Sequence, residues 1–216
     1  MKNSLKIIKT DDDSTTLKSS MFDETYHSIN GAISESLHVF INSGLAYIKQ
    51  AKIKILEIGF GSGLNAILTF DYAIRNKKFV EYHSIEKYPI DWNNLKEFVV
   101  PENLKTVFEK IHRAEWNKKS FISEEFEFLK IKEDLLEWQS DEKYDLIYFD
   151  AFSYNTQPEM WSESVFRKIY NICNKNAILV TYSSKGVVKR NLRSAGFVVT
   201  RIQGYKKHHI LRAFKK

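Results

Sequence analysis

The chain has 216 residues, of which 43% are hydrophobic and 28% are charged, as expected for one globular domain rather than a disordered chain. A single cysteine excludes a disulfide framework, and no cluster of histidines and cysteines has the spacing of a zinc site. No stretch approaches the ~18 continuous apolar residues of a membrane span, and no secretion signal opens the sequence. These features predict a cytoplasmic protein with no membrane association and no bound metal.

Charge is divided unevenly along the chain. The formal net charge is +6, but the segment from Ser164 onward holds 13 Lys and Arg residues and no acid. The first 163 residues hold 20 basic and 27 acidic residues. A cationic segment of this kind favours an anionic partner such as nucleic acid, and a solvated basic surface is the alternative that charge alone leaves open.

Apolar periodicity predicts alternating strands and helices along most of the chain. In chain order the predicted elements are strands at 5–9 and 15–19, a helix at 33–49, a strand at 54–59, a helix at 64–75, a strand at 80–86, helices at 92–99 and 104–111, a strand at 126–131, a short helix at 135–139, a strand at 144–150, a helix at 159–173, a strand at 177–182, a helix at 187–195, and strands at 197–202 and 209–214. The alternation predicts an α/β core over 51–216 with a mostly parallel sheet, closed by an antiparallel strand pair. Residues 1–50 are expected to form a hairpin and helix extension packed on this core.

The strongest chemical signal is a glycine-rich segment between the first core strand and its helix. It reads Glu57-Ile-Gly59-Phe-Gly61-Ser-Gly63-Leu-Asn65. Glycines at this point let the backbone turn sharply and pass close to a ligand. The segment also fits the loose dinucleotide pattern G-x-G-x-x-A. Glu57 favours S-adenosylmethionine instead, because a carboxylate before the first glycine suits the cationic methionine end of that cofactor and would repel a pyrophosphate.

Acidic residues stand at the ends of three further strands, and parallel sheets bind ligands at the carboxyl ends of their strands. Glu86 is placed to accept both ribose hydroxyls. Asp134 is a candidate for the adenine amino group, with Glu133 as a competitor and a helix N-cap as the alternative role. Asp150 is placed to accept a hydrogen bond from an amine and help remove its proton. Phe152 would stack on a base or shield the sulfonium, or belong to the core.

Several other segments accompany these residues in a fixed order along the chain. They are Phe22-Asp-Glu-Thr-Tyr26-His27-Ser28, Gly31-Ala32 to Glu35-Ser36, His38-Val-Phe-Ile41, Asp150-Ala-Phe152, Pro158-Glu-Met-Trp161, Tyr182-Ser-Ser-Lys185-Gly186, Val188-Lys-Arg190 and Ala195-Gly-Phe197. From about Asp13 to the end, the set resembles the MnmC/MnmD-type family of tRNA 5-methylaminomethyl-2-thiouridine methyltransferases. The resemblance implies a class I Rossmann-like fold with a seven-stranded sheet, S-adenosylmethionine as the cofactor, and no FAD, because the chain has no room for a flavin domain.

The resemblance also implies a reaction and a set of site residues. The partner would be a tRNA whose wobble uridine carries a 5-aminomethyl group, and the product would be 5-methylaminomethyl-uridine or its 2-thio form. The implied cofactor-binding residues are Glu57, Gly59, Gly61, Gly63, Asn65, Glu86, Asp134 and Asp150. The implied catalytic residues are Asp150 and Phe152, which would face the amine and the uracil. The candidates for contact with the substrate or tRNA are Tyr26, His27, Ser183, Lys185, Lys189, Arg190, Arg193, Lys206 and Lys207.

Alternatives stay open at this point. His27 can equally be a structural histidine, and Lys185 can be a solvated loop residue. The chain can instead alkylate another amine, although polyamine synthases favour a second acid after the strand-four aspartate, where this chain has Phe152-Ser153. A non-catalytic RNA-binding module is the third possibility. The sequence predicts neither the oligomeric state nor which tRNAs are modified.

Overall fold

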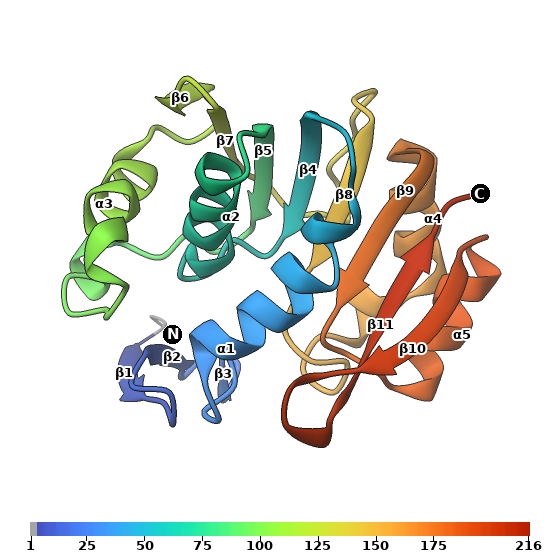
Figure 1. Cartoon of the computed structure of the whole chain (residues 1–216). Helices are drawn as coiled ribbons and strands as arrows, with labels where there is room; N and C mark the ends of the chain where they lie inside the picture. The colour runs from blue at the N-terminus through green and yellow to red at the C-terminus, as the bar shows by residue number, and fades with distance from the viewer. Residues whose placement is uncertain (1–3) are drawn as a thin grey trace.

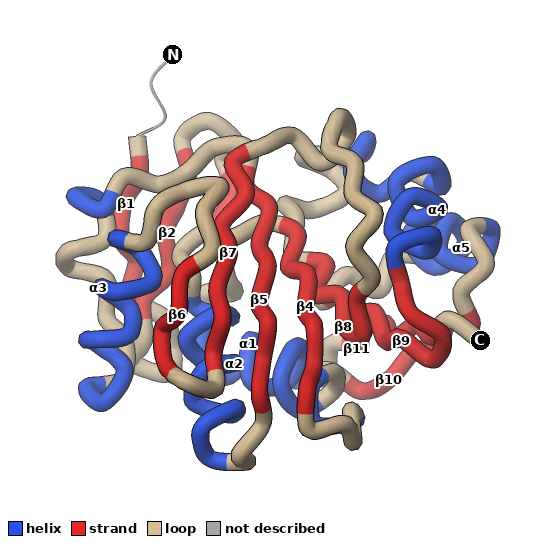
Figure 2. The backbone as a smooth tube through the Cα atoms, turned by 90° about the horizontal axis from the view of Figure 1, so that it is seen from above, coloured by secondary structure: helices blue, strands red, loops and turns tan. Residues whose placement is uncertain are grey.

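The core of the molecule is one twisted sheet. The computed structural model describes residues 4–216, without the side chain of Lys207. Within this range the sheet has eight strands in the order β10-β11-β9-β8-β4-β5-β7-β6 (Figures 1 and 2). The parallel strands are β4 (Lys52–Ile58), β5 (Phe79–Glu86), β7 (Phe126–Lys132), β8 (Tyr144–Phe149) and β9 (Cys173–Thr181). The antiparallel pairings come from β6 (Ser120–Ser123), β10 (Val198–Gln203) and β11 (His209–Phe214).

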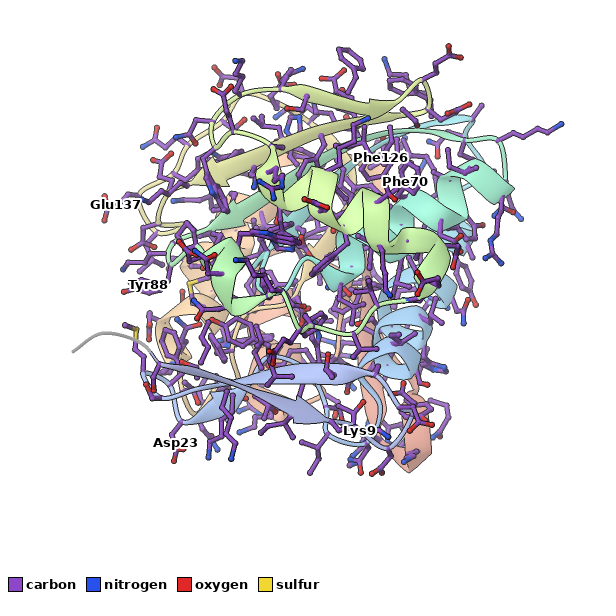
Figure 3. The ribbon with its side chains drawn as sticks, turned by 90° about the vertical axis from the view of Figure 1, so that its left-hand side faces the viewer. Lys9, Asp23, Phe70, Tyr88, Phe126 and Glu137 are labelled. Carbon is purple, nitrogen blue, oxygen red and sulfur yellow. The ribbon has the colours of Figure 1, made fainter. Side chains whose placement is uncertain are left out.

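Helices cover both faces of the sheet (Figure 2). One face packs against α2 (Leu64–Arg75) and α3 (Lys105–Arg113), and the other against α4 (Glu163–Ile172) and α5 (Gly186–Ser194). Side chains alternate between the two cores along each strand. Along β4, Ile53 and Ile55 belong to the α2 side, whereas Leu56 and Ile58 belong to the α4 side. Figure 3 labels Phe70 of α2 and Phe126 of β7, whose rings pack with centroids 5.5 Å apart.

The N-terminal segment forms a separate layer at the carboxyl ends of the parallel strands (Figure 1). Its elements are β1 (Leu5–Lys9), β2 (Thr15–Ser19) and β3 (Glu24–Thr25), which make an antiparallel sheet, then α1 (Ala32–Ser36), the π-helical turn η1 (Leu37–Asn42) and the 3₁₀ turn η2 (Leu45–Tyr47). Leu17, Phe40 and Leu45 are buried in the same cluster as the α2 side of the core. This packing places the segment over the carboxyl ends of the parallel strands, where it closes the cavity described below.

The fold class and most elements follow the sequence-based prediction, and the α/β arrangement with helices on both faces is confirmed. The expected strand count of seven was wrong, because β6 adds an eighth strand by pairing with β7. In this edge strand the two apolar residues, Phe121 and Ile122, are adjacent, so the sequence shows no apolar alternation. Phe121 is 67% exposed. Short edge strands are held by main-chain hydrogen bonds, which a hydrophobic pattern does not reveal.

Four predicted helices also differ. The helix at 33–49 changes to π geometry at Leu37, which shifts the helical phase and leaves that residue 36% exposed. At 92–99 there is a 3₁₀ turn, η3 (Trp92–Asn94), capped by Asp91, and at 135–139 there is a hydrogen-bonded turn. The helix at 159–173 is divided into η5 (Pro158–Trp161) and α4, because the Ser162 side chain accepts from the Val165 N–H and starts a new helix. The remaining short turns are η4 (Glu102–Leu104) and η6 (Tyr205–Lys207).

Asp12 ties the β1–β2 turn to the start of α1. Its Oδ1 accepts hydrogen bonds from the hydroxyls of Thr10, at 2.7 Å, and Ser14, and its Oδ2 accepts from the Ser34 N–H at 2.9 Å. Burial opposes ionisation, but these donors outweigh it and hold the pKa of Asp12 well below its usual value. One carboxylate therefore connects three pieces of the N-terminal layer.

We expect Asp12→Ala to lower the free energy of unfolding by roughly 2 kcal/mol, because it leaves several donors without their acceptor. Asp11→Ala is the matched control, since its exposed carboxylate makes a solvent-screened surface ion pair with Lys206 that contributes little to stability. Urea denaturation measures both changes, and hydrogen exchange should localise the first one to residues 4–36. Equal losses in the two variants would contradict the assigned role of Asp12.

Candidate active site

A cavity of about 230 Å³ opens at the carboxyl ends of β4, β5, β7 and β8. The N-terminal layer closes it from the opposite side. Its carboxylates are Glu24, Glu35, Glu86, Glu133, Asp134 and Asp150. The lysine among the described lining residues is Lys87. A net positive protein therefore has a cavity of negative charge, which favours a cationic ligand.

The glycine loop is shaped by what packs against it. Gly59 and Gly61 have φ values of 90° and 49°, which side chains other than glycine rarely adopt. A Cβ at Gly59 would lie 2.6 Å from the Asp150 carbonyl oxygen, and one at Gly61 would lie 2.8 Å from the Tyr26 ring. The loop can therefore approach both the end of β8 and the N-terminal layer only because these positions are glycine.

Two half-buried histidines hold the same loop from outside. His27 Nε2 bonds the Ser62 hydroxyl at 2.8 Å, and His112 Nε2 bonds the Ser62 carbonyl oxygen at 3.0 Å. Burial lowers the pKa of each histidine to about 4, so both rings are neutral at physiological pH. Since a neutral imidazole has one N–H, the contact with the Ser62 carbonyl assigns that hydrogen to His112 Nε2. His27 thus positions the loop and also lines the cavity.

Glu86 lines the cavity at the end of β5. Its Oε2 accepts from the Gly61 N–H at 3.1 Å, and its Oε1 accepts from the Tyr88 N–H at 2.8 Å. Burial raises the pKa of Glu86 despite these donors. Each oxygen keeps a second lone pair, so the carboxylate can still accept hydrogen bonds from a ligand.

Asp134 lines the cavity beside Glu133. Its Oδ2 pairs with Lys87 Nζ at 2.6 Å, and its Oδ1 accepts from the Leu136 N–H at 3.0 Å. Burial alone would raise the pKa of Asp134, but Lys87 and the Leu136 amide outweigh it and lower the pKa. The capping role is therefore real, for a turn rather than a helix, and the same side chain faces the cavity.

Behind the cavity, Asn65 joins the buried Glu57 to the partly exposed Asp150. Its Nδ2 donates to Glu57 Oε1 at 3.1 Å and to Asp150 Oδ2 at 2.7 Å. Glu57 is 0% exposed, Asn65 is 2% exposed, and Ser84 donates to Glu57 Oε2 at 2.7 Å. Asp150 lines the cavity, whereas Glu57, Asn65 and Gly63 are not among its lining residues. The sequence-based prediction places all four residues in direct contact with the cofactor.

An aromatic group borders the cavity next to Asp150. The Phe152 ring stacks on Phe22 with centroids 4.3 Å apart and meets Tyr26 edge-on at 4.9 Å. Tyr88, labelled in Figure 3, tilts against Phe22 at 5.8 Å. Phe152 is partly exposed and lines the cavity, so it is not a core residue.

Buried donors fix the backbone on either side of Phe152. Trp161 Nε1 donates to the Phe152 carbonyl oxygen at 2.8 Å, and the Tyr182 hydroxyl donates to the Ala151 carbonyl oxygen at 2.9 Å. These bonds hold residues 150–152 in place at the end of β8. Among the lining residues, Phe22, Glu24, Glu35, Lys87 and Tyr182 were not singled out as site residues from the sequence. Phe22, Glu24, Glu35 and Tyr182 stand inside segments that carry the family resemblance, which was the available signal.

Apart from Tyr26 and His27, which line the cavity, the predicted substrate and tRNA contacts are not among its lining residues. Ser183 is buried, and Lys185 Nζ donates to Asn155 Oδ1 at 2.6 Å. Helix α5 starts after the carboxyl end of β9, so Lys189 and Arg190 are near the cavity end of the sheet. Arg193 lies about one turn farther along the helix. Lys206, whose Nζ pairs with Asp11 at 3.0 Å, is in the β10–β11 connection, and the side chain of Lys207 lies outside the described part.

Over residues 4–216, no group of three or more His, Cys, Asp or Glu side chains is arranged to hold a metal ion. Among the helices of the same range, none combines the length and apolar character needed to cross a membrane.

The strand order, the glycine loop after β4 and the acids that end β5 and β8 define a Rossmann-like methyltransferase. The chain belongs to a family described as S-adenosyl-L-methionine-dependent methyltransferase, whose model matches residues 95–216. The predicted cofactor, S-adenosylmethionine, and the predicted enzyme class are thereby confirmed. The acidic cavity agrees with this cofactor, which is a sulfonium cation and not a pyrophosphate.

Relatives extend the comparison. The chain is 30% identical over 212 residues to the tRNA 5-methylaminomethyl-2-thiouridine biosynthesis bifunctional protein MnmC of Campylobacter fetus, covering 91% of this chain and 34% of that protein. It is 28% identical over 217 residues to the MnmC of Burkholderia multivorans, covering 89% and 32%. The chain therefore spans about a third of the length of these curated relatives.

Two solved structures are similar in fold to this chain. The crystal structure of MNMC2 from Aquifex aeolicus matches with a TM-score of 0.83 and 28% identity, over 98% of this chain and 70% of that one. Spermidine synthase from Thermotoga maritima matches with a TM-score of 0.62 and 11% identity, over 99% and 69%, which shows a shared fold alone.

The protonation of the site gives a prediction about cofactor binding. Burial raises the pKa of both Glu57 and Asp150 to about 8, so these carboxyls hold protons at pH 7. Because an acid with a raised folded pKa favours the protonated protein, stability should fall as the pH rises from the unfolded value towards 8. A cation in the cavity favours the ionised form, so binding S-adenosylmethionine at pH 7 should release up to about one proton.

Calorimetry in buffers of different ionisation enthalpy measures this proton release. Asp150→Asn cannot ionise and should release fewer protons. Glu97→Gln, an exposed change outside the cavity lining, should behave as the wild type. A binding enthalpy independent of the buffer in the wild type would contradict the raised pKa values.

Proposed function

We propose that this chain methylates the aminomethyl nitrogen of 5-aminomethyl-uridine, or of its 2-thio form, at the wobble position of tRNA. The observation that carries the proposal is the juxtaposition of Asp150 with the stacked rings of Phe152 and Phe22 in one acidic cavity. The carboxylate suits an amine, and the rings suit a nucleobase. The names of the MnmC relatives support the same substrate. Because that substrate is tRNA, we also propose a cytoplasmic location.

The cofactor residues of the proposal are those that reach the cavity. The Gly59–Gly61 backbone, Glu86 and Asp134 would hold S-adenosylmethionine, which supplies an electrophilic methyl group when bound. Asn65 and Glu57 would act from behind, through the hydrogen bond from Asn65 to Asp150. Because Asn65 occupies Oδ2 of Asp150, the other carboxylate oxygen is left for the substrate.

Asp150, once the bound cofactor cation favours its ionised form, would act as the proton acceptor. Methylation replaces one N–H bond of the amine by an N–CH₃ bond, and a primary ammonium must first lose a proton to expose its lone pair. Burial raises the pKa of Asp150 to about 8, closer to that of an amine than an ordinary carboxyl, which eases this transfer. The proton then passes from Asp150 to water, so one proton leaves per turnover.

The aromatic group would hold the uracil ring. Phe152, Phe22 and Tyr26 form a wall beside Asp150, and a base stacked there would place its 5-substituent over the carboxylate. A wobble base can reach a cavity of this depth only when it is turned out of the anticodon stack, as enzymes that modify bases commonly require.

The basic C-terminal segment serves two purposes in this proposal. Part of it holds the fold together, since Lys168 Nζ donates to the carbonyl oxygens of Leu135, Leu136 and Trp138, and Arg212 packs 3.7 Å from the Tyr47 ring centroid. The cations nearest the cavity end of the sheet, Lys185, Lys189, Arg190 and Lys206, are the proposed phosphate contacts.

The direct test is nucleoside analysis of tRNA that carries unmethylated 5-aminomethyl groups, before and after incubation with S-adenosylmethionine and this protein. We expect the mass of the modified uridine to increase by one methylene. Asp150→Asn should reduce the rate by at least about 100-fold while cofactor still binds. Methylation of free polyamines without methylation of tRNA would overturn the proposal, as would inactivity on tRNA by protein shown to bind the cofactor.

Charge reversal tests the RNA surface. The double variant Lys189→Glu, Arg190→Glu should weaken tRNA binding at least about tenfold and flatten its salt dependence, because phosphate contacts release counterions. Its affinity for S-adenosylmethionine should not change. Lys175→Glu carries the same kind of charge change at the opposite end of the sheet, at the start of β9, and should bind tRNA as the wild type does. An equal loss from Lys175→Glu would show a diffuse charge effect instead of a defined surface.

A further inference from the structure

Glu35 is a cavity carboxylate that comes from the N-terminal layer. It lies in α1, and Figure 1 shows that helix crossing below the carboxyl ends of the core strands. The Ser28 N–H donates to its Oε2 at 3.0 Å, and no second hydrogen bond to this carboxylate is found within residues 4–216. One oxygen of Glu35 is therefore available to a ligand.

In the proposed function, the substrate side of the cavity is the side of Asp150 that lies away from the proposed cofactor residues. The glycine loop, Glu86 and Asp134 follow β4, β5 and β7, whereas Tyr182 follows β9, on the other side of Asp150. The charge of Glu35 contributes to the raised pKa of both Asp150 and Tyr182, after the larger effect of burial. Glu35, Asp150 and Tyr182 line the same cavity, so we place Glu35 on this side of it.

Glu24 lies in the same part of the cavity but is already engaged. Its Oε2 accepts from the Thr156 hydroxyl at 2.6 Å and from the Ser153 N–H at 3.2 Å. These bonds attach the N-terminal layer to the loop after β8. Both carboxylates keep one oxygen without a hydrogen bond inside residues 4–216. Glu24 is held to the loop after β8 by two bonds, whereas Glu35 has a single bond within its own layer, and the charge of Glu35 is the one that acts on Asp150.

We propose that Glu35 binds the reacting nitrogen together with Asp150 and restricts the reaction to one methylation of a primary amine. This inference rests on the proposed function. A neutral primary amine has two N–H hydrogens and one lone pair. If Asp150 and Glu35 each accept one hydrogen, rotation about the C–N bond is blocked and the lone pair has a single direction. With Asp150 alone, that rotation is free.

The same arrangement explains selectivity. After one methylation the nitrogen of the neutral product has a single N–H, so it cannot satisfy both acceptors, and one carboxylate would be left against a methyl group. An amine that carries a carboxymethyl group has the same deficit and also brings a negative charge towards Glu35, Glu24 and Asp150. Glu35 would therefore exclude both the product and the carboxymethylated precursor, and the substrate must come from a reaction that leaves a free primary amine.

The test compares the wild type, Glu35→Gln, Glu35→Ala and the exposed control Glu97→Gln. Gln keeps an acceptor for the Ser28 N–H but removes the charge. With aminomethyl tRNA, Glu35→Gln should lower kcat/KM by about 10- to 100-fold, the range expected for losing a hydrogen bond to a charged group. Its calorimetric affinity for S-adenosylmethionine and its thermal midpoint should stay near those of Glu97→Gln.

Two selectivity readouts separate this role from a merely structural one. Carboxymethylaminomethyl tRNA should inhibit Glu35→Gln more strongly than the wild type, and Glu35→Ala should form some dimethylaminomethyl uridine, detected by mass. Unchanged kcat/KM and unchanged selectivity in an active background would overturn the inference and leave the proposed function standing. A loss of cofactor affinity as large as the loss of kcat/KM would also overturn it, because Glu35 would then hold the cofactor. Inactivity of the wild type on tRNA would instead refute the proposed function and the inference with it.

Discussion

Glu57 is buried and Asp150 is partly buried at the carboxyl ends of the neighbouring strands β4 and β8, and the two amide hydrogens of Asn65 are shared between them. Burying two acids without donors would be strongly unfavourable, so the start of α2 must lie where Asn65 can reach both. That requirement fixes the helix after the glycine loop, and the loop in turn must pass against the Asp150 carbonyl oxygen, where only glycine fits at position 59. The position of the proposed proton acceptor and the shape of the cofactor loop thus depend on one hydrogen-bonded chain.

The N-terminal layer completes the site from outside the Rossmann-like core. It supplies Phe22, Tyr26 and Glu35 to the cavity, and His27 holds Ser62 of the glycine loop. Asp12 and Glu24 attach this layer internally and to the loop after β8. A core that is common to many methyltransferases is combined here with a layer that adds aromatic rings and carboxylates, so substrate selectivity is expected to reside in the first fifty residues.

Charged residues have different roles in the cavity, on the surface and inside the fold. The acids of the cavity create a negative potential that suits a sulfonium and an amine, while the surface cations near the same end of the sheet suit phosphates. The basic segment from Ser164 onward contains both these surface cations and cations with purely structural contacts. Lys215 is one of the latter, because it donates to the carbonyl oxygens of Tyr170 and Cys173. A cation that satisfies buried carbonyl groups is not available to RNA, and the sequence does not separate the two kinds.

The sequence by itself determined the seven longer strands of the sheet, most of the helices that cover it and the residues at the strand ends, because apolar periodicity and glycine spacing are local properties of the chain. It also predicted that Glu86, Asp134 and Asp150 would meet, since the carboxyl ends of parallel strands share one edge. Only the tertiary structure decided that Glu57 lies behind the cavity, because the direction of its side chain depends on the parity of β4 and on the donor that α2 brings. It also decided that Glu35 lines the same cavity as Asp150, since the meeting of residues more than a hundred positions apart depends on how the layers pack, which no local pattern encodes.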